Sequence, residues 1–180
     1  MLKNWVWCDL EMTGLDPELH KVIEIATIIT NTQLEVIAQG PALVIHVEAQ
    51  HLHNLDPWIT SHHGATGLLD AVTKSVIGID DAMHQTLEFI KSHCKINEAP
   101  LCGNSIGTDR AFLRRHMPAL ESYLHYRNID VSSVKLLLQA WRPDLAPFKK
   151  KVQHRALDDI LESIAELKYY QTHLMAQKTM

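Results

Sequence analysis

The chain has 180 residues, a length typical of one domain. It is 46% hydrophobic and 21% charged, and its 7 Gly and 7 Pro residues exclude a collagen-like or Pro/Gly-rich disordered chain. The net charge of −4 is opposite in sign to that of proteins that bind long nucleic acids through many phosphates. A nucleic-acid role therefore requires few phosphates, bridging metal ions or a local basic patch.

The pattern of apolar residues bears on where the protein works. The longest apolar runs, residues 5–8 and 42–45, are four residues long, whereas a membrane span needs roughly 20. Asp9 and Glu11 interrupt the N-terminal apolar stretch before a signal-peptide core could form. The three cysteines have no paired metal spacing and are too few for a disulfide framework. These features predict a cytoplasmic protein with reduced thiols and no membrane association.

The first part of the chain carries strand patterns. Residues 4–10 are rich in strand formers and stop before the turn signal Thr13-Gly14. Residues 22–30 predict a second strand, and residues 34–47 hold one or two more, broken at Gly40-Pro41. Three adjacent strands predict an antiparallel meander.

The rest of the chain alternates short strands with helices. We expect a helix over residues 81–94 with Asp80 as its N-cap, then a short strand over 100–102 and a helix over 108–116. A strand over 128–131 follows, and after it a helix that is capped by Ser132 or Ser133 and runs through residue 141. The last element is a long helix from residue 155 to about 176. This order predicts an α/β fold with a mixed central sheet flanked by helices. We expect residues 1–180 to form a single domain.

Two carboxylates lie at the end of the first strand. Asp9 and Glu11 are two residues apart, so strand alternation puts both side chains on one face. A water-facing strand would explain a bare Asp-x-Glu pair, but this strand is otherwise apolar enough to be buried on both faces. Buried side by side, the two carboxylates repel each other and lose solvation, so a cation must compensate. The pair therefore indicates a divalent metal site.

Further candidate residues lie near two helix starts. Asp109 follows the turn Gly103-Asn104, and His154 precedes a helix that begins with Asp158 and Asp159. Each has an ordinary alternative role, because acids favour the positive end of a helix dipole and a lone histidine is usually structural. Helical periodicity does not choose between Asp158 and Asp159. His154 must reach a shared site from the preceding loop, because five residues on a helix separate two side chains by about 140°.

Taken together, these residues are suited to phosphodiester hydrolysis. Four carboxylates match two Mg²⁺ or Mn²⁺ ions, which prefer oxygen ligands. Two such ions about 4 Å apart stabilise the attacking and leaving oxygens of the reaction. A neutral histidine, with an ordinary pKa of about 6.5, can accept the proton of the attacking water.

Three segments resemble the exonuclease motifs of the oligoribonuclease family, the DEDDh-type 3′→5′ exoribonucleases with an RNase H-like fold. They are residues 9–16 (Asp-Leu-Glu-Met-Thr-Gly-Leu-Asp), residues 103–109 (Gly-Asn-Ser-Ile to Asp109) and residues 154–160 (His-Arg-Ala-Leu-Asp-Asp-Ile). The resemblance extends from residue 4 to about residue 170 and includes the connecting segments. It implies that His154 is the general base and that two divalent ions, Mg²⁺ or Mn²⁺, are held by Asp9, Glu11, Asp109 and Asp159. It thereby selects Asp159 over Asp158.

The resemblance also implies where the bases of the substrate lie. Leu15 corresponds to the family's wedge leucine, which inserts between the two bases of a dinucleotide, although a leucine after a turn is ordinarily a core residue. Trp58 and His63 match an aromatic residue and a histidine at one side of the pocket. A buried tryptophan and a surface histidine remain open as the alternative for these two.

Residues 125–132 resemble the segment that a partner subunit shares with the site. Tyr126 is implied to lie against the reacting end of the substrate from across a homodimer. Ser105, Arg127 and Ser132 are implied to cap the 5′-phosphate, Arg127 by charge-assisted hydrogen bonds. The C-terminal Gln171-Thr172-His173 departs from the more basic ending of the family.

The function implied is that of a cytoplasmic, homodimeric exoribonuclease that degrades very short RNA oligonucleotides, especially dinucleotides, to 5′-mononucleotides. One alternative is another DEDDh exonuclease, such as a proofreading subunit that acts on longer DNA or RNA ends. A second is a catalytically silent module that binds RNA ends. Loss of any one carboxylate would favour this last alternative, and all of them are present.

Overall fold

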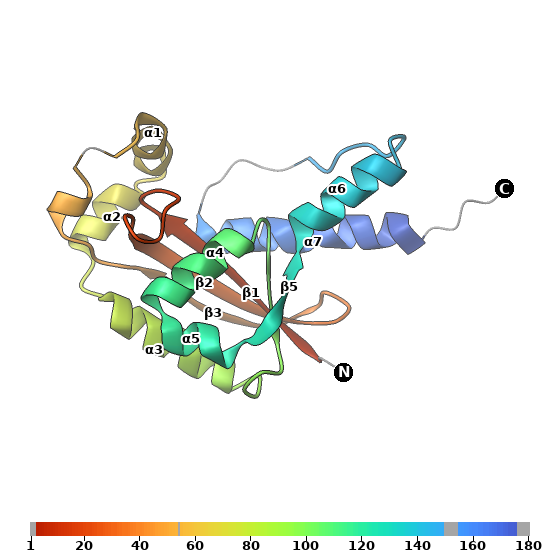
Figure 1. Ribbon diagram of the computed structural model, residues 1–180, viewed down its shortest axis with the longest axis horizontal. Coiled ribbons are helices and arrows are strands. Elements are labelled where there is room, and N and C mark those ends of the chain that lie inside the picture. Colours follow the sequence, from red (N-terminus) through yellow and green to blue (C-terminus); the bar gives the residue numbers. More distant parts are fainter. Residues whose placement is uncertain (1–2, 54, 150–154, 176–180) are drawn as a thin grey trace.

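The computed structural model describes residues 3–53, 55–149 and 155–175. Five strands in these residues form one mixed sheet (Figure 1), namely β1 (Asn4–Met12), β2 (Val22–Asn31), β3 (Val36–Val44), β4 (Pro100–Gly103) and β5 (His125–Asp130). Their order is β3-β2-β1-β4-β5. β1, β2 and β3 pair antiparallel, whereas β4 runs parallel to β1 and β5 parallel to β4. The predicted meander and the mixed sheet are confirmed.

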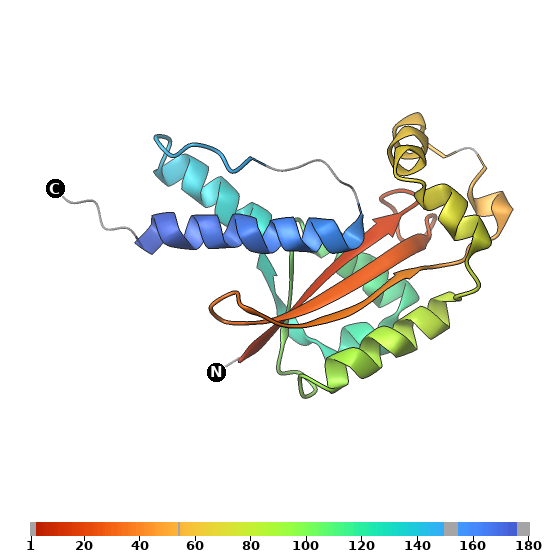
Figure 2. The ribbon, with the colours of Figure 1, turned by 180° about the vertical axis from the view of Figure 1, so that it is seen from behind.

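Helices cover both faces of this sheet. They are α1 (Pro57–Ala65), α2 (Leu68–Lys74), α3 (Ile79–Lys91), α4 (Gly107–His116), α5 (Pro118–Tyr123), α6 (Val131–Trp141) and α7 (Ala156–Met175), with a short 3₁₀ turn, η1 (Ala49–His51). One core packs α3, α4 and α5 against the sheet, and a second packs α6 and α7 against its other face (Figures 1 and 2). None of the described helices combines the length and hydrophobicity of a bilayer-spanning segment.

Side-chain alternation along β1 decides which face carries the carboxylates. Val6, Cys8 and Leu10 belong to the core beneath α3, α4 and α5. Trp7 belongs to the core beneath α7. Asp9 and Glu11 share the parity of Trp7 and therefore project to the α7 side of the sheet.

The region predicted as one or two strands over residues 34–47 is a single strand, β3. Gly40 does not break it. The ring of Phe89 lies 2.5 Å from where a Cβ at Gly40 would be, so this glycine makes room for α3 against the sheet.

Two predicted helix caps are wrong. Gly78, rather than Asp80, precedes α3, and Asp80 lies in the first turn, where its negative charge interacts favourably with the helix dipole. Asp130, rather than Ser132 or Ser133, caps α6. Its carboxylate accepts the backbone N–H of Ser132 at 3.0 Å, because a carboxylate at the end of β5 reaches the first free N–H groups of the helix.

The short elements η1, α1, α2 and α5 were not predicted from the sequence. Residues 49–76 show no sustained apolar periodicity, because these short helices cover only one end of the sheet. Leu68 and Val72 of α2 pack with Ile23 of β2 in a small separate cluster. The helix α1 brings His63 to the end of β1.

Candidate active site

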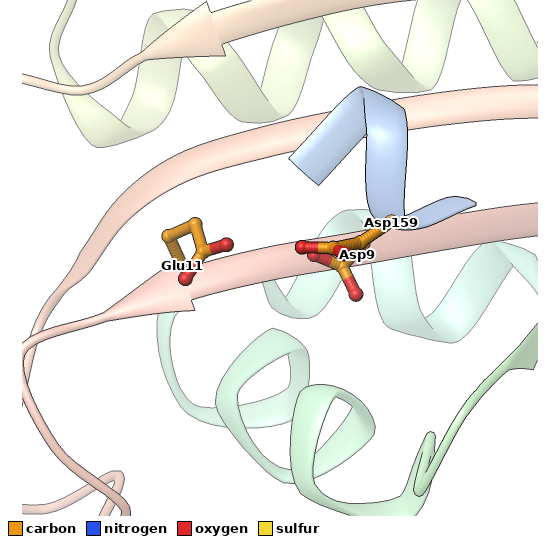
Figure 3. Close-up of side chains that lie close together, drawn as sticks. All are labelled: Asp9, Glu11 and Asp159. Atoms are coloured by element: carbon orange, nitrogen blue, oxygen red, sulfur yellow. The ribbon is translucent and has the colours of Figure 1, made fainter. Parts of the chain in front are cut away.

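Three carboxylates converge where β1 meets the first turn of α7 (Figure 3). One oxygen each from Asp9, Glu11 and Asp159 lie within 4.8 Å of one another. Asp9 and Glu11 come from the α7 face of β1, and Asp159 comes from the beginning of α7. Among the described residues the structure thus groups Asp159, and not Asp158, with the strand carboxylates.

Asp109 lies next to this cluster but outside the trio. It is 7% exposed, and its Oδ1 accepts the backbone N–H of Leu10 at 3.0 Å. This hydrogen bond ties α4 to β1 at the residue between Asp9 and Glu11. The four predicted acids therefore lie around one segment of β1, three of them within reach of a single ion.

Burial raises the pKa values of three of these acids. Burial, and then the charges of Asp109 and Glu11, raise the pKa of Asp9 well above its ordinary value. Burial, and then the charge of Asp159, raise the pKa of Glu11 to about 8. Burial raises the pKa of Asp109 to about 7. Partly buried oxygen donors that repel one another fit a hard divalent cation such as Mg²⁺ or Mn²⁺.

The raised pKa of Glu11 predicts an unusual pH dependence of stability. Because the pKa in the folded state (about 8) exceeds the ordinary value of 4.5, protonated Glu11 favours folding, and this contribution is lost as the pH rises through about 8. Without metal, the Glu11→Gln variant should gain in Tm over the unmodified protein as the pH rises from 5 to 9. Each kcal/mol corresponds to about 2–4 °C at this chain length. Thermal melts in EDTA measure the difference, and a difference independent of pH would contradict the repulsion.

A cavity of about 920 Å³ adjoins the carboxylates. Glu11, Leu15 and His63 all line it. Leu15 is 80% exposed, so the alternative of a core leucine is wrong. It follows Gly14, where the ring of His20 occupies the space that a Cβ would need. The loop after β1 thus presents an apolar side chain at the cavity beside the carboxylates.

His63 is buried at this end of the cavity. It is 2% exposed, so the surface alternative is wrong for this residue. Its Nε2 lies 3.1 Å from the carbonyl oxygen of Met12 and donates to it, since a carbonyl has no proton. Its Nδ1 lies 3.8 Å from Oε2 of Glu11. Trp58 belongs to α1, but its side chain lies outside the described part of the structure, and so does His154.

Ser105 and Ser132 come together although 27 residues separate them. Their hydroxyl oxygens are 3.1 Å apart, and the N–H of Ser105 donates to Oγ of Ser132 at 3.0 Å. Ser105 has a φ of 50°, a left-handed conformation that the turn after β4 imposes. Asn104 fixes the pair, because its Oδ1 accepts from Ser132 and its Nδ2 donates to Glu166 of α7. These two of the three predicted phosphate-cap residues are thus brought together.

Tyr126 and Arg127 lie on the outer strand β5. Tyr126 is 72% exposed, and its ring stacks on that of His125 with centroids 4.6 Å apart. The guanidinium carbon of Arg127 lies 5.2 Å from the centre of the Tyr126 ring. An aromatic side chain this exposed is available to a second molecule.

Sequence reasoning missed several residues that line or adjoin the site. His20, His51 and His53 line the cavity, and nothing in their spacing indicated it. Glu24, by contrast, had a signal, because it is the one charged residue among the nine residues 22–30 of the second predicted strand. A charge in a strand buried on both faces requires a specific partner.

Comparisons with known proteins show the family to which the chain belongs. The RNase T exonuclease family matches residues 6–167. The oligoribonuclease of Shewanella loihica is 53% identical over 168 residues, which cover 93% of both chains. That of Photobacterium profundum is 50% identical over 173 residues, which cover 96% of both. The chain belongs to the oligoribonuclease family. As a member it is a metal-dependent nuclease, a 3′→5′ exoribonuclease.

Solved structures support the fold of this oligoribonuclease-family chain. Exonuclease I of Methylocaldum szegediense superimposes with a TM-score of 0.71 at 16% identity, over 94% of this chain and 40% of exonuclease I. The zinc-bound complex of E. coli exonuclease I with single-stranded DNA gives a TM-score of 0.69 at 18% identity, over 96% of this chain and 41% of that one. The chain therefore spans about two fifths of exonuclease I, and the likeness confirms the exonuclease fold.

Proposed function

We propose that this exoribonuclease acts on very short RNA, dinucleotides above all, and releases 5′-mononucleotides by a two-metal-ion mechanism. The observation that carries the proposal is the convergence of Asp9, Glu11 and Asp159 beside a cavity of about 920 Å³. That volume is in the range of cavities that enclose one small ligand, about 300–1,000 Å³, and is small for a long strand. The proposal includes a single exonuclease domain over residues 1–180 and action in the cytoplasm.

In this mechanism the acids around β1 hold two divalent ions. Asp9, Glu11 and Asp159 supply the oxygens that are within reach of one ion, and Asp109 lies against the intervening backbone. The ions, when bound, supply Lewis-acid stabilisation of the oxygens that gain charge. His154, neutral at the start, accepts the proton of the attacking water. His63 holds the end of β1 in place by its hydrogen bond to Met12.

The remaining residues set the length of the substrate. Leu15, exposed at the cavity, enters between two bases, and Trp58 and His63 lie at the side of the base pocket. Ser105, Ser132 and Arg127 receive the 5′-phosphate and thereby close the site two nucleotides from the reacting end. The paired hydroxyls of Ser105 and Ser132 support this part of the proposal.

Turnover against substrate length tests the proposal. We expect kcat/KM to be highest for a 5′-labelled two-mer of RNA and to fall steeply towards a twenty-mer. Equal or faster turnover of the twenty-mer, or of a DNA of that length, would favour the alternative of a proofreading-type exonuclease. Binding of RNA without turnover in Mg²⁺ or Mn²⁺ would favour the silent binding module.

The phosphate cap predicts a strong preference for a 5′-phosphorylated dinucleotide. Losing a charged hydrogen-bonding partner typically costs about 1.5–3 kcal/mol, which is about 10- to 150-fold in affinity. We therefore expect a dinucleotide without the 5′-phosphate to bind more weakly by this factor. Calorimetric titration of the two dinucleotides into the Asp9→Ala variant measures it, and equal affinities would rule out the cap.

The exposed Tyr126 predicts a site shared across a two-fold dimer. Asp109→Ala and Tyr126→Ala homodimers should each be severely impaired. If Tyr126 serves the partner's site, a heterodimer of the two variants has one site with both defects and one with none. Differently tagged, purified heterodimers should then recover about half of the activity per dimer. Heterodimers that stay inactive would show that Tyr126 serves its own chain.

A further inference from the structure

Another acid of the sheet, Glu24, lies beside the carboxylate cluster. Glu24 is on β2, directly opposite Glu11 in the strand register, and is 2% exposed. Its charge raises the pKa of both Glu11 and Asp9. A buried carboxylate at this position adds repulsion to a cluster that is already strained by like charges, so its presence needs a reason.

Among the described residues, the side-chain hydrogen bonds of Glu24 go to the beginning of α7. Arg155 donates from Nε to Oε1 and Oε2 at 3.0 and 3.2 Å, and from Nη2 to Oε1 at 2.5 Å. The backbone N–H of Ala156, the first residue of α7, donates to Oε2 at 3.1 Å. One carboxylate thus holds both the arginine fork and a free N–H group of the helix terminus.

This contact lies within one helical turn of a metal-ligand candidate. The N–H of Asp159 donates to the carbonyl of Arg155 at 3.0 Å, so Arg155, Ala156 and Asp159 belong to the same turn. Any displacement of that turn from β2 moves the carboxylate of Asp159 relative to Asp9 and Glu11. Because β2 pairs with β1 along its whole length, the contact with Glu24 fixes the position of Asp159 relative to the strand that carries the other ligands.

We propose that Glu24 and Arg155 are positioning residues that clamp the first turn of α7 to β2, so that Asp159 completes the metal site. The inference rests on the metal site of the proposed function. It adds to that site a pair of residues that touch neither substrate nor metal.

The positive charge of Arg155 allows an experiment to distinguish the clamp from a purely electrostatic effect on metal binding. Arg155 is a cation close enough to Glu11 to lower its pKa. By charge alone, removing Arg155 would strengthen the binding of a divalent cation, and replacing it with lysine would leave binding unchanged. The clamp predicts weaker binding in both cases, because neither glutamine nor lysine reproduces the guanidinium fork.

The experiment is a calorimetric titration of Mn²⁺ into the substrate-free protein and its Arg155→Gln and Arg155→Lys variants. Residues that orient metal ligands typically account for about 10–100-fold in metal affinity. We expect a loss in this range for Arg155→Gln and a loss of about tenfold, at the lower end of the range, for Arg155→Lys. The matched control is Arg142→Gln, since Arg142 makes a similar two-bonded pair with Asp144 at the end of α6. It should bind Mn²⁺ as the unmodified protein does.

The outcomes distinguish a failure of the clamp proposal from a failure of the proposed metal site. Unchanged affinity in Arg155→Lys, or tighter binding in Arg155→Gln, overturns the clamp and leaves the metal site intact. Should Arg155→Gln fail to fold, Arg155→Lys alone decides. If the unmodified protein binds no Mn²⁺, or if Asp9→Ala binds it equally well, the metal site of the proposed function is overturned and the clamp with it. Melting temperatures of the metal-free proteins are recorded in parallel. A variant that loses stability but keeps its Mn²⁺ affinity also overturns the clamp.

Discussion

The Asp159→Asn variant is expected to lose turnover by about 10³-fold or more, the equivalent of several kcal/mol of transition-state stabilisation that the bound ions supply. Asparagine keeps the shape of the side chain but removes one of the three charges that lie within 4.8 Å of one another. The metal-free protein should at the same time become more stable to heat, because repulsion and desolvation are relieved. Steady-state rates in saturating Mg²⁺ or Mn²⁺ and melts in EDTA give the two results.

The neighbouring residue provides a matched control. Asp158→Asn makes the same chemical change one position away, where the carboxylate interacts with Arg155 and is not part of the described cluster. Its turnover should stay within about tenfold of the unmodified protein, since it holds no ion. Equal inactivation of the two variants would reverse the assignment. Asp9→Ala and Glu11→Ala should be as inactive as Asp159→Asn.

The His154→Ala variant is expected to lower kcat by about 10²–10⁴-fold, the usual contribution of a general base. KM for a dinucleotide should change much less, because the proton acceptor does not hold the substrate. The pH profile provides a second readout. In the unmodified protein, kcat should fall as the pH drops through the pKa of His154 in the complex, because the protonated ring accepts no proton.

The variant should lose this acid limb of the profile. Added imidazole at millimolar concentration is a direct check, because it can enter the space left by the ring and restore part of the rate. A variant with the same pH profile as the unmodified protein would remove His154 from the mechanism.

The order of elements and their faces followed from local patterns. Strands 4–10 and 22–30 were predicted within two residues of their observed ends, because strand formers and turn signals act over short stretches of chain. Alternation alone placed Asp9 and Glu11 on one face. Short helices such as α1 were missed because they are stabilised by contacts with the end of the sheet, and such contacts leave no periodic pattern in the sequence.

Caps and bends depended on neighbours distant in the chain. Asp80 looked like an N-cap by residue type, yet α3 begins one residue before it. The run through Gly40 stayed a strand because the ring of Phe89, 49 residues later in the chain, packs over it. The position of Asp109 against the N–H of Leu10 likewise came only from the packing of α4 on β1.

The sequence by itself determined the chemistry of this protein: which acids are available, that two of them share a strand face, and which family's motifs they match. Local patterns did not decide which acids meet: the family resemblance selected Asp159, and the tertiary structure shows that it lies with Asp9 and Glu11. Periodicity did not distinguish Asp158 from Asp159 as the metal ligand. The pattern of a helix gives the direction of each side chain around the helix axis, but not how the helix is rotated on the sheet. That rotation is set by contacts of α7 with the sheet, among them the apolar packing of Ile160 and Ile164 and the hydrogen bonds between Arg155 and Glu24, which lie 131 residues apart in the chain.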